Sequence, residues 1–516
     1  MANIAGIDLG TTFSTLAILN SIGRPEIVPN ADGERLTPSA IFFDEENPEI
    51  IRVGIEAINS RYLNAERSVR WIKRYMADAD YRRNIDGKDW RPVELSSLIL
   101  KKLEQDCSSE RGEIRDAVIS VPAHFDEVRR KATMDAGTMA GLNVIGIVNE
   151  PVAAALYYAT TREVSGKVLV YDLGGGTFDV TVMDVTGHRM KIICSQGDHA
   201  LGGVDFDREI LKMLEQAYKE KFDTELITSD EDRAKYEDEA EDIKKTLSRR
   251  KVAKKMLYGP AGSVKTEITR EMFEKAISSL IARTDILLEV ALEEAGIKPS
   301  GINKVLLVGG SSRIPLVRKR LEETFGFAPE VAVNVDECVA LGAALHAGLT
   351  MLREKPDAVP AGISGGLGDI DLTDVCNHSY GTICAPIDKE TSRRVIENRV
   401  ILKKNTPLPC ESTQMFYTMA EGQKEVEVTV TQGEDTAVDY VNKIATHKFK
   451  LPPDRPARCP IKVTYSYDVN QRMHCSFEDL ESGRVLKVDF SLDRDGRMSQ
   501  SNIKQKADEL ETLKVK

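Results

Sequence analysis

The residues best suited to chemistry lie between Val168 and Met183, in the sequence VLVYDLGGGTFDVTVM. Two apolar runs flank three glycines, Gly174 to Gly176, so the backbone can turn consecutive N–H groups toward an anion without a Cβ in the way. Asp172 ends the first apolar run, and Asp179 lies inside the second. Carboxylates beside a phosphate are suited to Mg²⁺ or its waters. The stretch predicts a phosphate-binding β-hairpin, with an ordinary glycine-turn hairpin as the alternative.

A second stretch of the same design opens the chain, with the sequence IAGIDLGTTFSTLAI from Ile4 to Ile18. Asp8 corresponds to Asp172, and Gly10 corresponds to Gly174, about 160 residues later. Two such turns indicate a pseudo-symmetric nucleotide cleft and make the ordinary hairpin the minor interpretation. The chain lacks the G-x-x-x-x-G-K-S/T pattern, and its glycines lie between strands rather than before a helix. A P-loop and a dinucleotide-binding fingerprint are therefore excluded.

Two charged residues between these stretches are candidates for the same site. Lys73 lies in a predicted helical stretch that begins at Gly54, where a solvated lysine on a helix face is the plainer interpretation. Glu150 follows a predicted strand, and Pro151 suits the first position of the next helix. A carboxylate at a strand end can serve chemistry in an α/β crevice, or it can complement the helix dipole. The sequence leaves both alternatives open.

Further glycine turns and a charged helix follow in the second half. Gly202 and Gly203 open a long predicted helix, whose N-terminus could hold an anion. Gly309 and Gly310 follow an apolar strand. The segment from 229 to 257 is predicted to be helical, and its acidic residues precede a group of lysines and arginines. Mixed signs at helical spacing indicate a solvated face rather than a nucleic-acid surface.

The elements that must position these residues alternate between strand and helix. Strands are predicted at 117–121 and 144–148, with helices at 126–140 and 340–349. Together with the glycine turns, this pattern predicts an α/β domain of two similar halves over residues 1–353. Proline and glycine are frequent in residues 354–374, which predicts a linker.

After the linker, apolar residues alternate with polar ones. Val426 and Val428 follow this pattern, as do residues 461–467 and 486–492. A period of two is typical of half-buried strands. We expect an all-β module at 375–498 and a short charged helix within 499–516.

The composition limits the classes of function. A formal net charge of −12 over 516 residues argues against sequence-independent binding to nucleic acid or anionic membranes. Eight cysteines without a Cys-x-x-Cys pair indicate neither a zinc site nor a disulfide framework. No apolar run has the length of a membrane span, and Asp8 comes too early for a signal peptide. We therefore expect a cytoplasmic protein.

Taken together, the motifs resemble those of the seventy-kilodalton heat-shock chaperones, within the superfamily that also contains actin and the sugar kinases. The similarity covers nearly the whole chain. The segments that carry it are Gly6–Thr12, Val121–Phe125, Asn149–Pro151, Asp172–Asp179, Leu201–Asp207, Gly309–Pro315, Lys404–Pro409 and Val430–Glu434. The resemblance implies a two-lobed, actin-like α/β ATPase domain with ribonuclease-H-like halves, followed by an all-β sandwich domain.

The resemblance also implies roles at the phosphate end of the cleft. Lys73 and Glu150 would orient the attacking water, with Asp172 and Thr177 as further catalytic residues. Asp8, Asp172 and Asp179 would hold Mg²⁺ through its waters, with K⁺ as a further cation. The donors to the phosphates of ATP or ADP would come from Gly10, Thr11, Thr12, Gly174, Gly175, Gly176 and Thr177.

Further roles are implied for the rest of the nucleotide, the domain interface and the sandwich. Pro122 and Arg130 resemble a proline switch and an arginine relay between the domains. Val426 and Val428 match a peptide pocket and Met419 an arch above it, with ordinary core residues as the alternative. The remaining nucleotide contacts would be Gly202, Gly203, Glu241, Lys244, Ser248, Gly309, Gly310, Ser311, Arg313 and Asp336.

The chain departs from the family's pattern in several places. The long helical lid that normally follows the sandwich is absent apart from one helix, so we expect rapid peptide exchange. The segment 370–374 is less apolar than the family's leucine-rich linker, which questions the coupling between the domains. Val204 stands where an acidic residue is common, and Phe13 replaces a more polar side chain or a tyrosine.

The resemblance implies an ATP-dependent molecular chaperone that hydrolyses Mg-ATP to control the binding of unfolded or extended polypeptide by the sandwich. Its implied partners are a J-domain co-chaperone and a nucleotide-exchange factor, with neither nucleic acid nor membrane. One alternative is a nucleotide-gated adaptor or co-chaperone with little turnover. Another is an actin-like or sugar-kinase-type ATPase, against which the sandwich argues.

Overall fold

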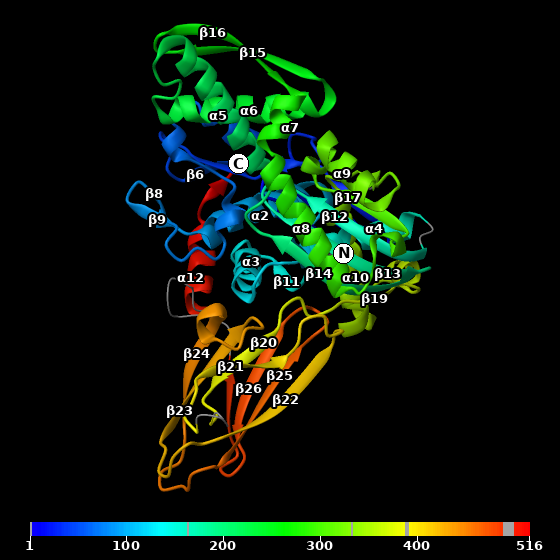
Figure 1. Cartoon of the computed structure of the whole chain (residues 1–516), viewed down its shortest axis with the longest axis vertical. Helices are drawn as coiled ribbons and strands as arrows, with labels where there is room; N and C mark the ends of the chain where they lie inside the picture. Colours follow the sequence, from blue (N-terminus) through cyan, green and yellow to red (C-terminus); the bar gives the residue numbers. More distant parts are fainter. Residues whose placement is uncertain (1–2, 163–164, 332–333, 388–391, 489–499) are drawn as a thin grey trace.

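The first predicted phosphate-binding stretch forms a hairpin at the centre of a sheet. The computed structural model describes residues 3–162, 165–331, 334–387, 392–488 and 500–516 (Figure 1). The hairpin consists of β1 (Asn3–Asp8) and β2 (Phe13–Leu19), which pair antiparallel with Asp8 opposite Thr15. The sheet has the order β11-β10-β1-β2-β3, and β4 also pairs with β2. Its other strands are β3 (Pro25–Val28), β4 (Thr37–Pro38), β10 (Ile114–Val121) and β11 (Asn143–Asn149).

The second stretch forms the equivalent hairpin of a second sheet. Strands β12 (Ser165–Leu173) and β13 (Phe178–Thr186) pair antiparallel with Asp172 opposite Asp179. The sheet order is β18-β17-β12-β13-β14-β19, so its first five strands repeat the order of the first sheet. The remaining strands are β14 (Arg189–Asp198), β17 (Lys304–Val308), β18 (Glu330–Val331) and β19 (Asp371–Thr373). The predicted α/β domain of two similar halves is thus confirmed.

Two apolar helices join the halves. Helices α4 (Glu150–Thr161) and α10 (Cys338–Glu354) belong to one buried cluster that includes residues of both sheets. Their backbones are in close contact, because a Cβ on Gly342 would lie 1.8 Å from the carbonyl oxygen of Ala153. A glycine is therefore required at this crossing, where α10 can only approach α4 without a side chain.

Each half carries additional elements beyond its central sheet. In the first half these are β5 (Ala40–Phe43), β6 (Ile50–Val53), α1 (Ile55–Ser60), β7 (Ser68–Arg70), β8 (Arg83–Ile85), β9 (Lys88–Trp90), α2 (Pro92–Arg111) and α3 (Glu127–Met139). In the second half they are α5 (Gly203–Phe222), α6 (Asp230–Arg249), β15 (Val252–Gly259), β16 (Gly262–Thr269), α7 (Arg270–Ala276), α8 (Ser278–Glu294) and α9 (Pro315–Phe325). Figure 1 shows the β15–β16 hairpin at the end of the molecule opposite the C-terminal sandwich.

The predicted all-β module is a sandwich of two four-stranded antiparallel sheets. Their orders are β21-β20-β23-β24 and β22-β25-β26-β27. Alternate residues of β25, among them Tyr465, face a shared core that also contains Phe477 and Val430. The strands are β20 (Tyr380–Cys384), β21 (Glu397–Leu402), β22 (Cys410–Tyr417), β23 (Glu425–Gln432), β24 (Asn442–Lys450), β25 (Pro460–Tyr467), β26 (Met473–Asp479) and β27 (Arg484–Val488).

The segments on either side of the sandwich attach to different halves of the α/β domain. Before it, α11 (Ala361–Leu367) leads into β19, which pairs parallel with β14 of the second half. After it, α12 (Gln500–Glu511) lies beside α3 of the first half (Figure 1). The chain then forms β28 (Lys514–Val515), which pairs parallel with β6.

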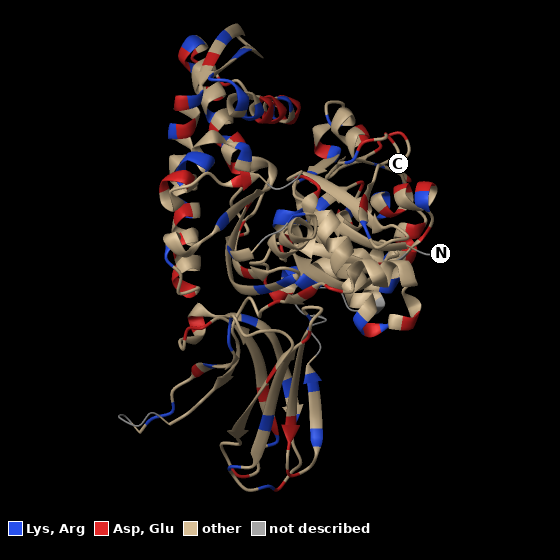
Figure 2. Cartoon of the chain, turned by 90° about the vertical axis from the view of Figure 1, so that its right-hand side faces the viewer, with Lys and Arg blue, Asp and Glu red and all other residues tan. Residues whose placement is uncertain are grey.

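Charged residues of both signs are interspersed along the helices, as Figure 2 shows. Helix α6 follows this pattern, with acidic residues in its first turn and Arg249 in its last. Among the described residues, no helix combines the length and apolar character needed to cross a bilayer.

The structure differs from two of the predicted elements. Lys73 lies in a 3-10 turn, Ile72–Tyr75, after β7 rather than in a long helix. The helix predicted to reach residue 257 ends at Arg249, because the following residues pair as β15 with β16. The predicted linker segment, whose role stays a prediction, contains α11 and β19. Residues 489–492 of a predicted strand lie outside the described residues.

Candidate functional site

A cavity of about 510 Å³ lies between the two hairpins and collects most of the predicted site residues. Its lining includes residues from both halves, together with α6 and the turn before α9. The predicted residues that line it are Asp8, Gly10, Thr11, Thr12, Lys73, Glu150, Asp172, Gly174, Gly175, Thr177, Glu241, Lys244, Ser248, Gly309, Gly310, Ser311, Arg313 and Asp336. Gly176, Gly202, Gly203 and Asp179 are not among the lining residues. Gly202 and Gly203 lie behind the triple-glycine turn, which we call the cradle, and Asp179 accepts hydrogen bonds from the backbone of Ala123 and His124.

The two glycine turns face each other across the cavity. A Cβ on Gly175 would lie 2.1 Å from the hydroxyl oxygen of Thr12, so only glycine allows this approach. Behind the turn, a Cβ on Gly202 would lie 2.5 Å from the backbone nitrogen of Gly176. The turn itself is closed by a 3.0 Å hydrogen bond from the Gly174 N–H to the Thr177 carbonyl. Backbone and hydroxyl donors from both halves thus converge on one end of the cavity, as phosphate binding requires.

A lysine and several carboxylates are buried beside this cradle. The ammonium of Lys73 forms a close ion pair with Glu150, and both side chains are buried. Burial opposes the charge on Lys73, but Glu150 and Asp8 outweigh it and raise the pKa of the ammonium. The solvated-lysine interpretation is therefore wrong, and Lys73 is a charged group held inside the site.

The aspartates carry an excess of buried negative charge. Burial, reinforced by Glu150, raises the pKa of Asp8 to about 7, although Lys73 opposes the shift. Burial likewise raises the pKa values of Asp172 and Asp179 well above the ordinary value, again with a contribution from Glu150. One lysine does not compensate these carboxyl groups, so a divalent cation fits the charge of the site.

Two of these carboxylates already accept hydrogen bonds from the chain. Within the described residues, no group of three or more histidine, cysteine, aspartate or glutamate side chains is arranged to bind a metal ion directly. Asp8 accepts a 3.0 Å hydrogen bond from the Ser120 hydroxyl. Asp179 accepts backbone hydrogen bonds from Ala123 and His124 at 3.1 and 3.2 Å. The donor set therefore suits Mg²⁺, which keeps several waters in most protein sites.

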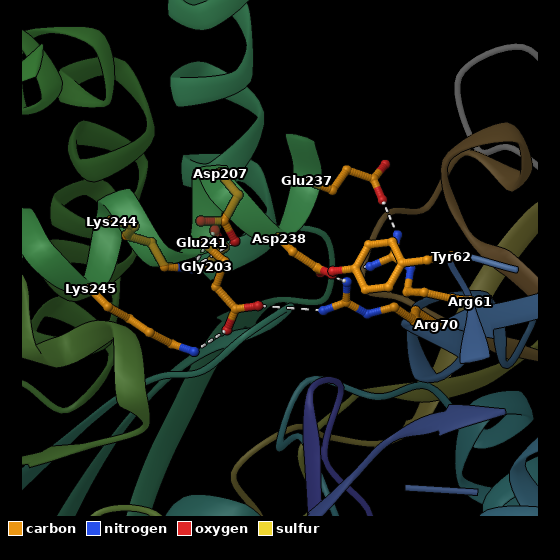
Figure 3. Close-up of polar contacts among 10 residues, drawn as sticks. All are labelled: Arg61, Tyr62, Arg70, Gly203, Asp207, Glu237, Asp238, Glu241, Lys244 and Lys245. Atoms are coloured by element: carbon orange, nitrogen blue, oxygen red, sulfur yellow. Dashed lines mark hydrogen bonds and ion pairs between the residues drawn. The ribbon is translucent and has the colours of Figure 1, made fainter. Parts of the chain in front are cut away.

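The other end of the cavity is formed by α6 and the turn after β17. Lys244 donates to Asp207 at 2.7 Å and to the Gly203 carbonyl at 3.1 Å, which ties α6 to the start of α5 (Figure 3). The Ser311 hydroxyl donates to the Gly174 carbonyl at 2.8 Å. Arg313 pairs with Asp336 at 2.7 Å and remains half exposed at the mouth of the cavity.

Sequence reasoning missed an ionic bridge that joins the halves over this cavity. Arg61 follows α1 and Arg70 ends β7, and both donate to one oxygen of Asp238 on α6, at 2.6 and 2.7 Å. Tyr62 donates to the other oxygen (Figure 3). Glu237 accepts from Arg61 at 3.0 Å and Glu241 from Arg70 at 3.4 Å. No local signal could have shown this bridge, because its partners lie far apart in the sequence.

The sequence also did not identify the apolar part of the cavity wall. Phe13, Leu36, Val335 and Val339 line it and come from three separate segments. Apolar residues occur throughout any protein core, so the residue types alone could not show that these four line a cavity.

Of the two predicted interdomain residues, Arg130 contacts the sandwich, and Pro122 lies next to the backbone that binds Asp179. Arg130 is fully buried and donates to the Ala123 carbonyl at 3.0 Å and to Asn149 at 2.8 Å. It also donates to Gln471 of the sandwich. Pro122 precedes the two residues whose N–H groups bind Asp179. A continuous chain of polar contacts therefore joins Asp179 to Gln471 of the sandwich.

Other contacts secure the same interface. Glu127 of α3 accepts hydrogen bonds from Tyr380 at 2.7 Å and from Tyr467 at 2.6 Å. Asp374 at the end of the linker accepts from Asn149 and Gln471. Lys404 of the sandwich pairs with Glu294 of α8 at 2.9 Å.

The three residues predicted to bind peptide differ in exposure. Val428 is 3% exposed and belongs to the core of the sandwich, and Val426 is partly buried against that core. Met419 is 50% exposed. Their role in binding peptide stays a prediction.

Comparisons with known proteins agree with this architecture. Residues 4–86 and 77–516 match the family described as "Hsp70 protein". The chain is 37% identical over 492 residues to the proteins named "Chaperone protein DnaK" of Thermotoga neapolitana and Thermotoga petrophila. These matches cover 93% of this chain and 79% of each relative. The chain therefore belongs to the Hsp70 family of ATP-dependent molecular chaperones.

Proposed function

We propose that four residues of the cavity carry ATP hydrolysis in this chain: Lys73, Glu150, Asp172 and Thr177. As an Hsp70-family protein the chain is an ATPase and chaperone that uses ATP or ADP with Mg²⁺ and binds unfolded polypeptide. The observation that carries the assignment of residues is the buried Lys73–Glu150 pair beside two facing glycine turns. This arrangement fixes a positive charge where the terminal phosphoryl group would lie.

The protein contributes positioning and charge to the reaction. Water attacks the γ-phosphorus, the bond from that phosphorus to the β–γ bridging oxygen breaks, and ADP and inorganic phosphate result. Lys73 faces the charge that spreads over the phosphoryl oxygens, and Glu150 orients the water. Thr177 and the two glycine turns hold the phosphates. No covalent intermediate forms on the protein.

The buried carboxylates indicate where cations would bind. Asp8, Asp172 and Asp179 would hold Mg²⁺ through its waters, and the bound ion would neutralise phosphate charge. We also propose K⁺ as a further cation near Asp179. The nucleoside would lie between α6 and the turn after β17, among Glu241, Lys244, Ser248, Gly309, Gly310, Ser311, Arg313 and Asp336.

The chaperone cycle would couple this site to the sandwich. The route runs from Asp179 through the backbone after Pro122 to Arg130, and from Arg130 to Gln471. We propose residues 1–353 as the ATPase domain, 354–374 as the linker, 375–498 as the peptide-binding domain and 499–516 as a C-terminal helical segment. Met419 and Val426 would contact an extended apolar peptide, with Val428 beneath them.

We also propose two partners and a cellular location for the chain. A J-domain co-chaperone would stimulate hydrolysis, and a nucleotide-exchange factor would open the cavity. All eight cysteines are free thiols in the structure, which supports a reducing compartment such as the cytoplasm.

The test is the steady-state ATPase rate with and without an apolar heptapeptide. We expect Lys73→Ala and Thr177→Ala to abolish phosphate release, and we expect the peptide to accelerate the unmodified chain. Lys212→Ala removes an exposed lysine of α5 and serves as the matched control. Tight ATP binding without turnover in the unmodified chain would contradict the proposal.

A further inference from the structure

Arg74 reaches from the catalytic turn of the first half into the second half. It follows Lys73 in the 3-10 turn, whose preceding residue Trp71 has a φ of 57°. Both terminal nitrogens of Arg74 lie 3.1 Å from one oxygen of Asp205, and one of them donates to the Ala200 carbonyl at 2.9 Å. The Arg74 and Asp205 side chains are only 11% and 13% exposed. A largely buried ion pair thus crosses between the halves beside the phosphate cradle.

The second oxygen of Asp205 organises the loop that supports the cradle. It accepts the N–H of Gly202 at 2.9 Å and so caps the start of α5. The next two N–H groups, of Gly203 and Val204, donate to the carbonyls of Gly174 and Gly175 at 3.0 and 2.8 Å. The carboxylate of Asp205 therefore connects Arg74 to the triple-glycine turn.

The stem of Arg74 also lies against the cradle. A Cβ on Gly176 would be 3.1 Å from the Cδ of Arg74. Val204, the neighbour of Asp205 in this loop, is buried and offers no charge. Asp205 is thus the carboxylate of this loop that receives the arginine.

We propose that Arg74 is a positioning residue for ATP hydrolysis. Its side chain fixes the position of Lys73 in the first half relative to the glycine cradle of the second. The inference rests on the proposed role of Lys73. The cradle keeps its hydrogen bonds to the loop of Gly203 and Val204 within its own half, so it would still bind phosphate without Arg74. Only the alignment between the halves would be lost.

Because Arg74 aligns the halves and the cradle binds phosphate, loss of Arg74 should change the hydrolysis rate much more than the affinity for ATP. Replacing Arg74 with methionine should lower the single-turnover hydrolysis rate by about tenfold to a hundredfold, the effect of losing one charge-assisted contact. The dissociation constant for ATP should change by less than about threefold, because the nucleotide contacts of the second half remain. A residue that only stabilises the fold would not separate these two constants.

The experiment compares full-length variants in single-turnover hydrolysis, equilibrium binding of a fluorescent ATP analogue, and thermal unfolding. Arg74→Met and Asp205→Asn should both slow hydrolysis, and the double variant should be no slower than the slower single one. Arg74→Lys should recover part of the rate. Arg208→Met is the control, because Arg208 also pairs with Asp205 at 3.1 Å but comes from the same half and is 53% exposed.

Two outcomes would overturn the inference while leaving the proposed function intact. One is an unchanged hydrolysis rate in Arg74→Met, in a chain whose Lys73→Ala variant is inactive. The other is a loss in Arg74→Met that Arg208→Met reproduces, which would indicate a general effect on Asp205. If Lys73→Ala itself hydrolyses ATP normally, the proposed function fails first.

Discussion

The bridge of Arg61 and Arg70 to Asp238 should control how quickly nucleotide leaves the cavity. Helix α6 forms one wall of the cavity, and the bridge holds this helix to the first half (Figure 3). Because the bridge joins the two walls, we expect it to oppose their separation when nucleotide leaves. We therefore expect Asp238→Asn, which keeps an acceptor oxygen but removes the charge, to accelerate the release of ADP.

The burial of the three side chains sets the size of this effect. Arg61 and Arg70 are 5% and 10% exposed, and Asp238 is 22% exposed. Hydrogen bonds to charged groups contribute about 1.5–3 kcal/mol, whereas exposed ion pairs contribute about 0–1 kcal/mol. For partly buried pairs we take about 1 kcal/mol for each arginine, or about 2 kcal/mol for both. This energy corresponds to a release rate about thirtyfold faster.

Stopped-flow release of a fluorescent ADP analogue measures this rate directly. Asp242→Asn is the matched control, because it removes the same charge from an exposed position of α6. A release rate of Asp238→Asn within threefold of the unmodified chain would refute the reasoning. Equal acceleration by Asp242→Asn would refute it as well, since the effect would then come from net charge.

Substitutions at Gly342, Asp374 and Leu372 test three further contacts of the fold. Gly342→Ala should lower the midpoint of thermal unfolding, because its Cβ would meet the Ala153 carbonyl at 1.8 Å, whereas Gly365→Ala, in open space, should not. Burial raises the pKa of Asp374 to about 6, so the docked state favours the protonated carboxyl group. The contribution of Asp374 to domain docking is therefore complete below pH of about 4 and is lost as the pH rises through 6. Asp374→Asn should remove this pH dependence from the hydrogen exchange of the β19 amides. Leu372→Asp should separate β19 from the core that it packs against and abolish stimulation of the ATPase by peptide, measured as phosphate release.

The sequence predicted the parts of the molecule that depend on local pattern. The two glycine hairpins, the repeat of Asp8 by Asp172 and the alternating strands of the sandwich all carry short-range signals, and each forms the expected element. Glycine was informative because the approach of Gly175 to Thr12 leaves no space for a side chain. The cavity accordingly contains most of the residues assigned to it from the motifs.

The remaining features depend on contacts between distant segments. The helical pattern before Lys73 was wrong because β7 pairs with β5 and interrupts it. The linker contains the breakers typical of an irregular segment, yet its last residues gain hydrogen bonds at the edge of β14. The acidic run of α6 has the pattern of a solvated face, and nothing within it shows that Arg61 and Arg70 lie opposite. Pairings of this kind are set by tertiary structure, which overrides local preference.

The attachment of the sandwich to both halves has a mechanical consequence. Its leading segment is hydrogen-bonded to β14 in the second half, while Tyr467 and Gln471 contact the first half through Glu127 and Arg130. A tension applied to the sandwich would therefore act on both halves at once, through β14 in the second half and through Glu127 and Arg130 in the first. Pulling force on a client chain would thus be transmitted to the rate at which the nucleotide cavity opens.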